Sequence, residues 1–249
     1  MVLCIDVGNT TIKVARVTDG AVGHMARTAT SADPRTAAEA LPIGDPMTVA
    51  SGTIALVSVV PAWTEAIRDI AGNLGWHLIE ADAGSIPIPI RVTHPERVGA
   101  DRLLGAWTAR ELFGGPVIVV DIGTATTIDV VDGNGTFVGG AIMPGPELAI
   151  RSLAMDTAQL PNVAPRRPQR AIGRDTAEAV QSGVVFGHQA AIGGLLVRIT
   201  AELGGATPPT VVLTGGGSSS LGSIQGVDVT EPDLLMRGLG MFAALVGAA

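Results

Sequence analysis

The fold is decided by a short stretch that occurs twice, first as Ile5-Asp6-Val7-Gly8-Asn9-Thr10-Thr11-Ile12 and again as Val120-Asp121-Ile122-Gly123-Thr124-Ala125-Thr126-Thr127-Ile128. The second copy carries one more residue than the first. Each copy follows an apolar run typical of a strand and leads into a further strand and a hairpin. A repeat at this long spacing predicts two similar halves and argues against a solenoid.

Each half is predicted to be a mixed sheet with helices, which makes the chain an α/β protein. The Gly114-Gly115-Pro116 stretch marks the expected boundary, so the halves are 1–115 and 116–249. Short strands are expected at Thr48–Val49 and Ala55–Val60. A long helical stretch at Asp175–Leu203 contains several glycines, which predict close packing or a break there.

Composition and net charge indicate that the chain is folded and which kinds of molecule it is expected to bind. Of the 249 residues, 47% are hydrophobic and 16% are charged, which excludes a disordered chain. The formal net charge of -7 disfavours nucleic acid and anionic membranes, because both repel an acidic surface. A small-molecule partner is therefore expected.

The ends of the chain and its cysteine content predict a cytoplasmic protein. The single cysteine, Cys4, forbids an intramolecular disulfide and suits a reducing compartment. The start has no basic region typical of a signal peptide, and Asp6 interrupts its apolar run. The apolar stretch from Leu234 contains Arg237 and is shorter than the roughly 20 residues of a membrane span, so we expect a closing core helix.

The repeated Asp-x-Gly turn suits a nucleotide. Its glycine lets the backbone approach a ligand closely, since it has no Cβ. Turn amides and hydroxyl or amide side chains can bind phosphate oxygens, and the aspartate can hold hydrated Mg²⁺. Taken singly, either motif could be only a turn, whereas their duplication after matching strands favours a triphosphate site. The glycine-rich turn at Thr214–Gly217 could approach the base or ribose.

Other nucleotide and metal motifs are missing from the sequence. It contains no Walker-type phosphate loop and no Gly-x-Gly-x-x-Gly after a strand. No His or Cys cluster has zinc spacing. The scattered histidines are interpreted as structural or surface residues: His24, His77, His94 and His188.

The stretch Gly99-Ala100-Asp101-Arg102 precedes a predicted helix and is the candidate acceptor site. Asp101 could deprotonate an acceptor hydroxyl, and Arg102 could bind a carboxylate with two hydrogen bonds. The alternatives are a helix N-cap for Asp101 and a surface cation for Arg102. Thr176, at the start of another predicted helix, could contact substrate or cap that helix.

Over essentially its whole length the sequence resembles the type III pantothenate kinases. The resemblance rests on an ordered set of stretches: Asp6–Thr10, Ser58–Pro61, Gly99–Arg102, Asp121–Thr127, Gly139–Gly145, Asp175–Gly187 and Thr214–Gly216. It implies the actin-like (ribonuclease H-like) fold of acetate and sugar kinases, which has duplicated mixed sheets with flanking helices and a nucleotide cleft between the halves. It also implies phosphorylation of pantothenate by ATP, the first step of coenzyme A synthesis.

The resemblance further implies roles for individual residues. Asp101 would be the catalytic proton acceptor, and pantothenate would contact Gly99, Ala100, Asp101, Arg102 and Thr176. Asp121 would help bind K⁺ or NH₄⁺, and Mg²⁺ would accompany ATP, with Asp6 as its ligand. A homodimer is implied as well. ATP would contact Asp6, Val7, Gly8, Asn9, Thr10, Thr11, Ile12, Lys13 and Thr124.

Two positions depart from the family pattern. Val92 stands where these kinases usually have a tyrosine, and the chain has no tyrosine at all. Asp175 replaces an asparagine before Thr176 and preserves capping. Because Val92 replaces the usual tyrosine, the alternative of a related kinase with another acceptor stays open. A silent ATP-binding regulator and a structural protein without a nucleotide site are further alternatives.

Overall fold

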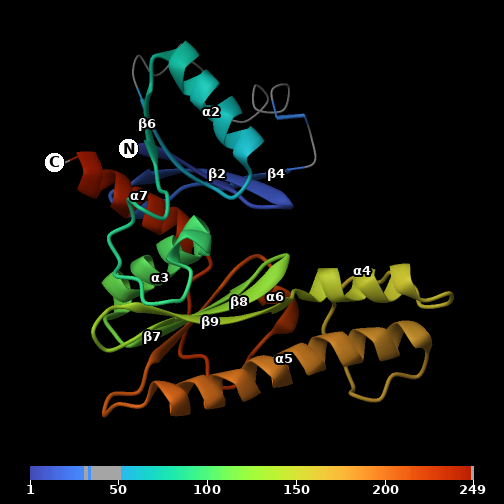
Figure 1. The fold of residues 1–249 in the computed structure, drawn as a ribbon. Coiled ribbons are helices and arrows are strands. Elements are labelled where there is room, and N and C mark those ends of the chain that lie inside the picture. Colours follow the sequence, from blue (N-terminus) through green and yellow to red (C-terminus); the bar gives the residue numbers. More distant parts are fainter. Residues whose placement is uncertain (31–32, 35–51, 248–249) are drawn as a thin grey trace. The chain divides into compact units, whose positions relative to one another are not determined.

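The computed structural model describes residues 1–30, 33–34 and 52–247 (Figure 1). The expected strand at Thr48–Val49 lies outside the described residues. The chain divides into two compact units, one made of Met1–Pro89, Thr93–Glu111 and Asp233–Ala249, the other of Ile90–Val92 and Leu112–Pro232. The C-terminal segment thus belongs to the first unit. The division into duplicated halves at residue 115 stays a prediction.

The first unit contains a mixed sheet, which has six strands in the described part of the chain. Its order is β3-β2-β1-β5-β6, with β4 also paired to β2. β1 runs antiparallel to β2 and parallel to β5, which is parallel to β6. The strand bounds are β1 Val2–Val7, β2 Thr11–Thr18, β3 Ala21–Val22, β4 Ala26–Ala29, β5 Thr53–Ser58 and β6 His77–Glu80.

Alternation along the strands gives this sheet two buried faces. One face packs its aliphatic side chains around Trp63 of α2 (Pro61–Leu74). The opposite face, which includes Cys4, packs against α7 (Leu234–Gly247), and Figure 1 shows the two helices on opposite sides of the sheet. Burial raises the pKa of the Cys4 thiol to about 12, which fits the expected small buried residue.

Helix α3 (Ala100–Phe113) packs closely against α7 in the first unit, and a short 3₁₀ turn, η1 (Pro95–Arg97), comes before it. The rings of Trp107 and Phe242 meet edge to face with centroids 6.3 Å apart. A Cβ on Gly238 would collide with Thr108. Helix α3 as far as Glu111, with Asp101 in its first turn, belongs to the first unit.

The second unit repeats the sheet pattern. Its order is β11-β10-β7-β8-β9, in which β7 is antiparallel to β8 and parallel to β10. β7 and β1 therefore occupy equivalent places in the two sheets, as do β8 and β2. The predicted duplication of mixed sheets with flanking helices is confirmed. The bounds are β7 Val117–Ile122, β8 Ala125–Val131, β9 Phe137–Pro144, β10 Thr210–Thr214 and β11 Val229–Thr230.

The helices of the second unit are α4 (Pro146–Asp156), α5 (Thr176–Leu203) and α6 (Ser218–Leu221). Of the two alternatives predicted for the glycines in the long helical stretch, close packing or a break, the break is wrong, because α5 is continuous through them. Val185, Ile192 and Leu196 pack against the sheet, and this contact offsets the weak helix propensity of glycine. Among the described helices α5 alone is long and apolar enough to cross a membrane, which by itself is weak evidence for a span.

Candidate functional site

The first Asp-x-Gly turn connects β1 to β2 and is held by backbone hydrogen bonds. The Gly8 N–H donates to the Thr11 carbonyl over 3.0 Å, and a Cβ on Gly8 would lie 3.2 Å from that oxygen. Thr30 supports the turn from outside: its N–H donates to the Thr10 carbonyl and its Oγ1 to the Gly8 carbonyl, over 3.0 and 2.8 Å. These hydrogen bonds join the turn to Thr30 and fix its backbone.

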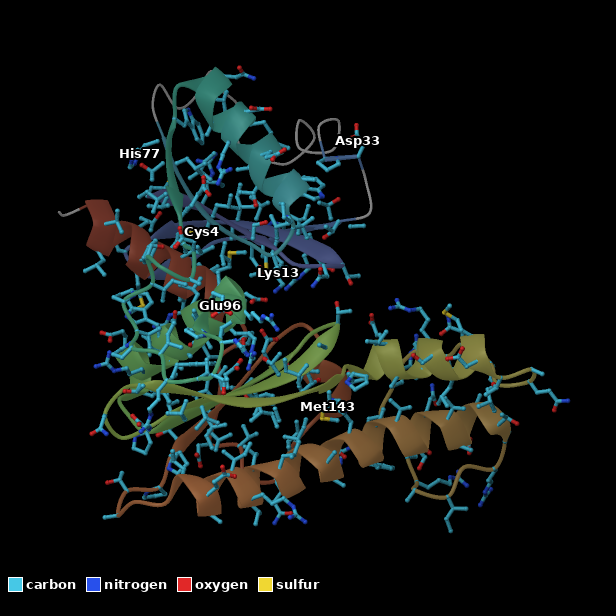
Figure 2. All side chains as sticks on the ribbon, in the orientation of Figure 1. Cys4, Lys13, Asp33, His77, Glu96 and Met143 are labelled. Carbon is cyan, nitrogen blue, oxygen red and sulfur yellow. The ribbon has the colours of Figure 1, made fainter. Side chains whose placement is uncertain are left out.

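Asp6 and Lys13 face each other at the base of this turn. They are direct partners across the antiparallel pair β1 and β2. Lys13 Nζ lies 2.9 Å from Asp6 Oδ2, and the Asp6 side chain is only 6% exposed against 24% for Lys13. Lys13 is labelled on β2 in Figure 2. By strand alternation Asp6 shares a sheet face with Cys4, the face that packs against α7.

Asp101 is the second residue of α3, two residues after the N-cap. The Gly99 carbonyl accepts the Leu103 N–H over 3.2 Å, which makes Gly99 the N-cap. Asp101 Oδ1 accepts the N–H of Arg102 over 2.8 Å. The alternative interpretation of Asp101 as the N-cap is therefore wrong, although its carboxylate does bind an amide of the first turn.

The environment of Asp101 raises its carboxyl pKa above the ordinary value. Burial is the largest cause, and the negative charge of Asp6 acts in the same direction. The Arg102 amide and guanidinium act in the opposite direction, but the pKa remains raised. The first unit thus brings together Asp6, Lys13 and Asp101, and a carboxylate with a raised pKa is a stronger base than an ordinary surface aspartate.

The second Asp-x-Gly turn connects β7 to β8 and is packed between two other turns. The Gly123 N–H donates to the Ala125 carbonyl, and the Gly145 N–H donates to the Thr124 carbonyl over 2.9 Å. From the other side, the Gly217 N–H donates to the Ile122 carbonyl over 2.8 Å. The glycine-rich turn at the end of β10 therefore lies directly against the turn that follows Asp121.

Glycine is required at two places in this packing. A Cβ on Gly145 would collide with the carbonyl oxygens of Gly123 and Thr124. Gly215 has a positive φ of 92°, and a Cβ on it would collide with the Asp121 carboxylate and the backbone of Ile122. The second unit thus brings Asp121, Thr124 and the Thr214–Gly217 turn to the carboxyl ends of parallel strands β7 and β10.

Thr176 is the first residue of α5, and its side chain is exposed. Asp175 caps this helix, since its Oδ1 accepts the Glu178 N–H over 2.8 Å. In return the Glu178 carboxylate accepts the Arg174 N–H over 2.9 Å. Asp175 therefore performs the capping, which leaves the Thr176 hydroxyl available for another contact. A contact with substrate stays a prediction.

A buried pair of polar residues in the second unit has no counterpart in the sequence predictions. Thr126 Oγ1 lies 2.9 Å from His188 Nε2, and both residues are buried. Burial lowers the pKa of His188, which favours the neutral ring. The pair ties β8 to α5 just after the second Asp-x-Gly turn. This agrees with a structural interpretation of His188.

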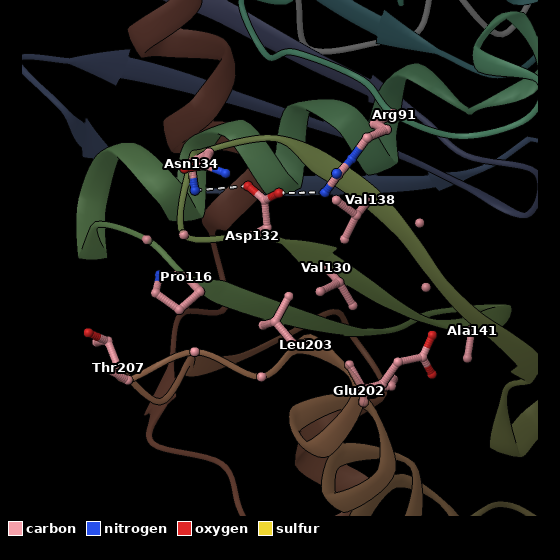
Figure 3. Close-up of a pocket in the computed structure, with 18 of the residues that line it drawn as sticks. Arg91, Pro116, Val130, Asp132, Asn134, Val138, Ala141, Glu202, Leu203 and Thr207 are labelled. Atoms are coloured by element: carbon pink, nitrogen blue, oxygen red, sulfur yellow. Dashed lines mark hydrogen bonds and ion pairs between the residues drawn. The ribbon is translucent and has the colours of Figure 1, made fainter.

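A cavity of about 650 Å³ opens in the second unit (Figure 3). It lies beside Pro116, before β7, whereas Asp121 lies near the other end of that strand. Its apolar wall includes Leu195, Ile199 and Leu203 of α5. At its mouth, the Arg91 guanidinium pairs with the Asp132 carboxylate over 2.7 Å. None of the predicted site residues lines this cavity.

A family model described as type III pantothenate kinase matches residues 2–198. The chain belongs to the type III pantothenate kinase family. A type III pantothenate kinase of Parafrankia sp. strain EAN1pec is 38% identical, with 96% of each chain covered. That of Streptomyces coelicolor is 37% identical, again with 96% of each chain covered. A shorter match, to the enzyme of Thermomicrobium roseum, is 43% identical over 75% of this chain and 72% of that one.

Solved structures show that this pantothenate kinase family member has the actin-like fold. A putative 2-dehydro-3-deoxygalactonokinase of Sinorhizobium meliloti superposes with a TM-score of 0.57 at 17% identity, covering 99% of both chains. A conserved putative Baf family transcriptional activator of Campylobacter jejuni superposes with a TM-score of 0.67 at 17% identity, covering 100% of both chains. At these identities the likeness concerns the fold alone.

Proposed function

We propose that this chain transfers the γ-phosphoryl group of ATP to the hydroxyl of pantothenate, giving ADP and 4′-phosphopantothenate, the first step of coenzyme A synthesis. Family membership over nearly the whole chain supports the substrate. The observation that carries the chemistry is the burial of Asp101 in the first turn of α3, which raises its pKa, with the negative charge of Asp6 acting in the same direction. Phosphoryl transfer needs a positioned acceptor hydroxyl and somewhere for its proton to go.

In this proposal Asp101 accepts the proton of the pantothenate hydroxyl. Arg102, next to it on the first turn of α3, binds the pantothenate carboxylate, a role that suits a planar guanidinium. Gly99 and Ala100 form the backbone of the same site, and the exposed Thr176 hydroxyl supplies a further contact. Support comes from the raised Asp101 pKa and from the free side chain of Thr176 beside a cap made by Asp175.

ATP is proposed to contact the first turn, from Asp6 to Lys13, and Thr124 of the second. The described residues contain no group of three or more His, Cys, Asp or Glu side chains suited to a metal. That fits Mg²⁺, which keeps several waters and takes phosphate oxygens from its nucleotide. Asp6 is the proposed carboxylate for this ion, and Lys13 beside it balances charge. When bound, Mg²⁺ would neutralise charge on the phosphates.

Asp121 is proposed to help bind K⁺ or NH₄⁺. Its carboxylate lies against the backbone of Gly215, where a side chain at that position would collide with it. Turn carbonyls are close by at Ile122, and oxygen ligands of this kind suit a weakly hydrated cation. The proposal predicts activity that depends on the monovalent ion.

We further propose a cytoplasmic homodimer. Only 22% of the most apolar window of α5 is buried within the chain. Val197 on α5 is 72% exposed, and Met155 and Ile172 are also exposed. Apolar surface of this extent fits a contact with a second copy of the chain. Light scattering after size exclusion checks it, and a monomer at assay concentrations would contradict it.

A pantothenate-dependent ADP-release assay with Mg²⁺ and K⁺ tests the activity, with mass spectrometry of the product. The expected result is a product heavier by one phosphate group. ATP turnover on other hydroxyl compounds with none on pantothenate would support a related kinase with another acceptor. Val92, in place of the usual tyrosine, is the reason to consider that alternative. Nucleotide binding without turnover of any acceptor would support the silent regulator.

A further inference from the structure

A side chain at position 99 would need the space that the Asp101 carboxylate fills. A Cβ built on Gly99 would lie 2.5 Å from Oδ1 of Asp101, closer than any real contact allows. The atom it meets is the end of a flexible side chain, so the helix backbone could stay in place while the carboxylate moved. The space left by the missing Cβ is therefore the space in which the Asp101 carboxylate lies.

Backbone conformation does not explain the glycine at this position. Gly99 does not have a positive φ, so an L-residue could adopt its backbone conformation. Gly75 is the contrasting case: it caps α2 with φ 66°, and a Cβ there would meet nothing within 4 Å. Gly75 is needed for its conformation, whereas Gly99 is needed for its lack of a side chain.

Helix capping does not explain it either. Gly99 is the N-cap of α3, where Ser, Asp or Asn would supply a side-chain oxygen for an unpaired amide of the first turn. In its place the carboxylate of Asp101 accepts the Arg102 N–H. A serine at position 99 would compete for this same donor. The chain thus has a weaker N-cap residue at position 99, and the Asp101 carboxylate lies next to it and binds the amide that a better N-cap would bind.

We propose that Gly99 is a positioning residue, which by lacking a Cβ holds the Asp101 carboxylate in its catalytic position. This inference rests on the proposed function, because it assumes that Asp101 is the proton acceptor. It assigns Gly99 a role through Asp101, in place of direct contact with pantothenate. Any side chain at position 99 would push the carboxylate away from the acceptor hydroxyl.

Gly99→Ser tests the proposal, because it should affect stability and turnover differently. Serine is a good N-cap, so the melting temperature should stay the same or rise. A displacement of about 1 Å can cost about 10²-fold, so kcat should fall by about that factor while KM for pantothenate changes little. Gly99→Ala, which adds the Cβ without a hydroxyl, should lower kcat similarly. Gly72→Ser is the matched control, since a Cβ there meets nothing within 4 Å.

A double mutant separates positioning from contact. If Gly99 acts through Asp101, then Gly99→Ser should cost no further kcat in an Asp101→Asn background. A rise in KM in both backgrounds would show direct contact with pantothenate and overturn the proposal. So would wild-type kcat in Gly99→Ser, or losses that multiply in the double mutant.

A crystal structure of Gly99→Ser gives a readout that does not depend on activity. The expected result is an intact α3 with the Asp101 carboxylate turned away from residue 99. A carboxylate in its original place would overturn the proposal. If the unaltered enzyme failed to phosphorylate pantothenate, the proposed function would fall, and this structure would still decide whether Gly99 positions Asp101.

Discussion

Lys13 Nζ lies 2.9 Å from Asp6 Oδ2, in a pair formed across neighbouring strands at the base of the first turn. Burial raises the pKa of Asp101, and the negative charge of Asp6 raises it further. One carboxylate therefore has two electrostatic neighbours, a cation on β2 and a second carboxylate on α3. The ionisation of the proposed base depends on the charge state of the proposed phosphate turn.

Asp6→Asn should lower turnover by about 10²-fold, because it removes the proposed Mg²⁺ ligand and leaves Lys13 without this partner. It should also lower the pKa of Asp101, since the charge that helps to raise it is gone. Turnover measured against Mg²⁺ concentration and pH checks both effects. Asp69→Asn, at an exposed position on α2, is the matched control. Unchanged turnover in Asp6→Asn would exclude Asp6 from the site.

The pH dependence of the enzyme should report the raised pKa of Asp101. The base must be ionised, so kcat should fall as pH falls through a value above the ordinary carboxyl pKa of about 3.9. Since the folded pKa exceeds the unfolded pKa, this group favours folding more as pH falls between the two values. Activity should therefore drop where its contribution to stability rises. A flat rate profile down to that ordinary pKa would contradict the assignment.

The monovalent ion offers a separate test. Replacing K⁺ with Na⁺ at constant ionic strength should reduce turnover if Asp121 helps bind the larger ion. Asp121→Asn should weaken activation, so that half-maximal rate needs about tenfold more K⁺, equivalent to a loss of about 1.4 kcal/mol of binding. Equal rates of the unaltered enzyme in the two salts would remove the site from the proposal.

Thr126→Val should destabilise the protein by about 1–3 kcal/mol, because it leaves the buried His188 ring without its partner. Valine has nearly the shape of threonine, so packing should change little. Urea unfolding measures the loss. Thr207→Val, at an exposed position, should change stability by about 0.5 kcal/mol or less. Equal stability of the two variants would show that the hydrogen bond contributes nothing.

The duplicated sheets could be predicted from sequence because their signals are local. An apolar run, a turn containing glycine and a hairpin appear in order around both Asp6 and Asp121, and these patterns depend on near neighbours. The chain path of the last helix could not be predicted in this way. That helix, α7, packs in the first unit, with Phe242 against Trp107, although it follows the second sheet in the sequence.

The candidate site shows the same limit. Asp101 was found from its motif, but its place in the second position of α3 depends on where the helix begins, which sequence reasoning fixes poorly. The link between Asp101 and Asp6 joins residues far apart in the chain. The Thr126–His188 pair also joins residues far apart in the chain, and a lone histidine gave no signal for it. The glycines of α5 predicted close packing or a break, and the sequence alone could not decide between them, because the apolar contacts of α5 with the sheet depend on residues far apart in the chain.

Asp101→Asn decides whether Asp101 is the proton acceptor. Asparagine keeps the size of the side chain and an oxygen that can accept the Arg102 N–H, so α3 should start as before. It cannot take a proton, and loss of a general base costs about 10²–10⁴-fold in rate. Turnover should fall within this range, while ATP binding measured by calorimetry should be unchanged.

The stability of this variant should move in the opposite direction to its activity. Burial and Asp6 both disfavour the ionised carboxylate in the folded protein, so neutral asparagine should leave the melting temperature at neutral pH unchanged or higher. That advantage should shrink as pH falls and aspartate itself becomes protonated. Glu111→Gln, exposed near the other end of α3, controls for loss of a charge from the same helix. A purely structural Asp101 predicts the reverse pattern, with lower stability and preserved turnover, and a fully active Asp101→Asn enzyme would end its assignment as the base.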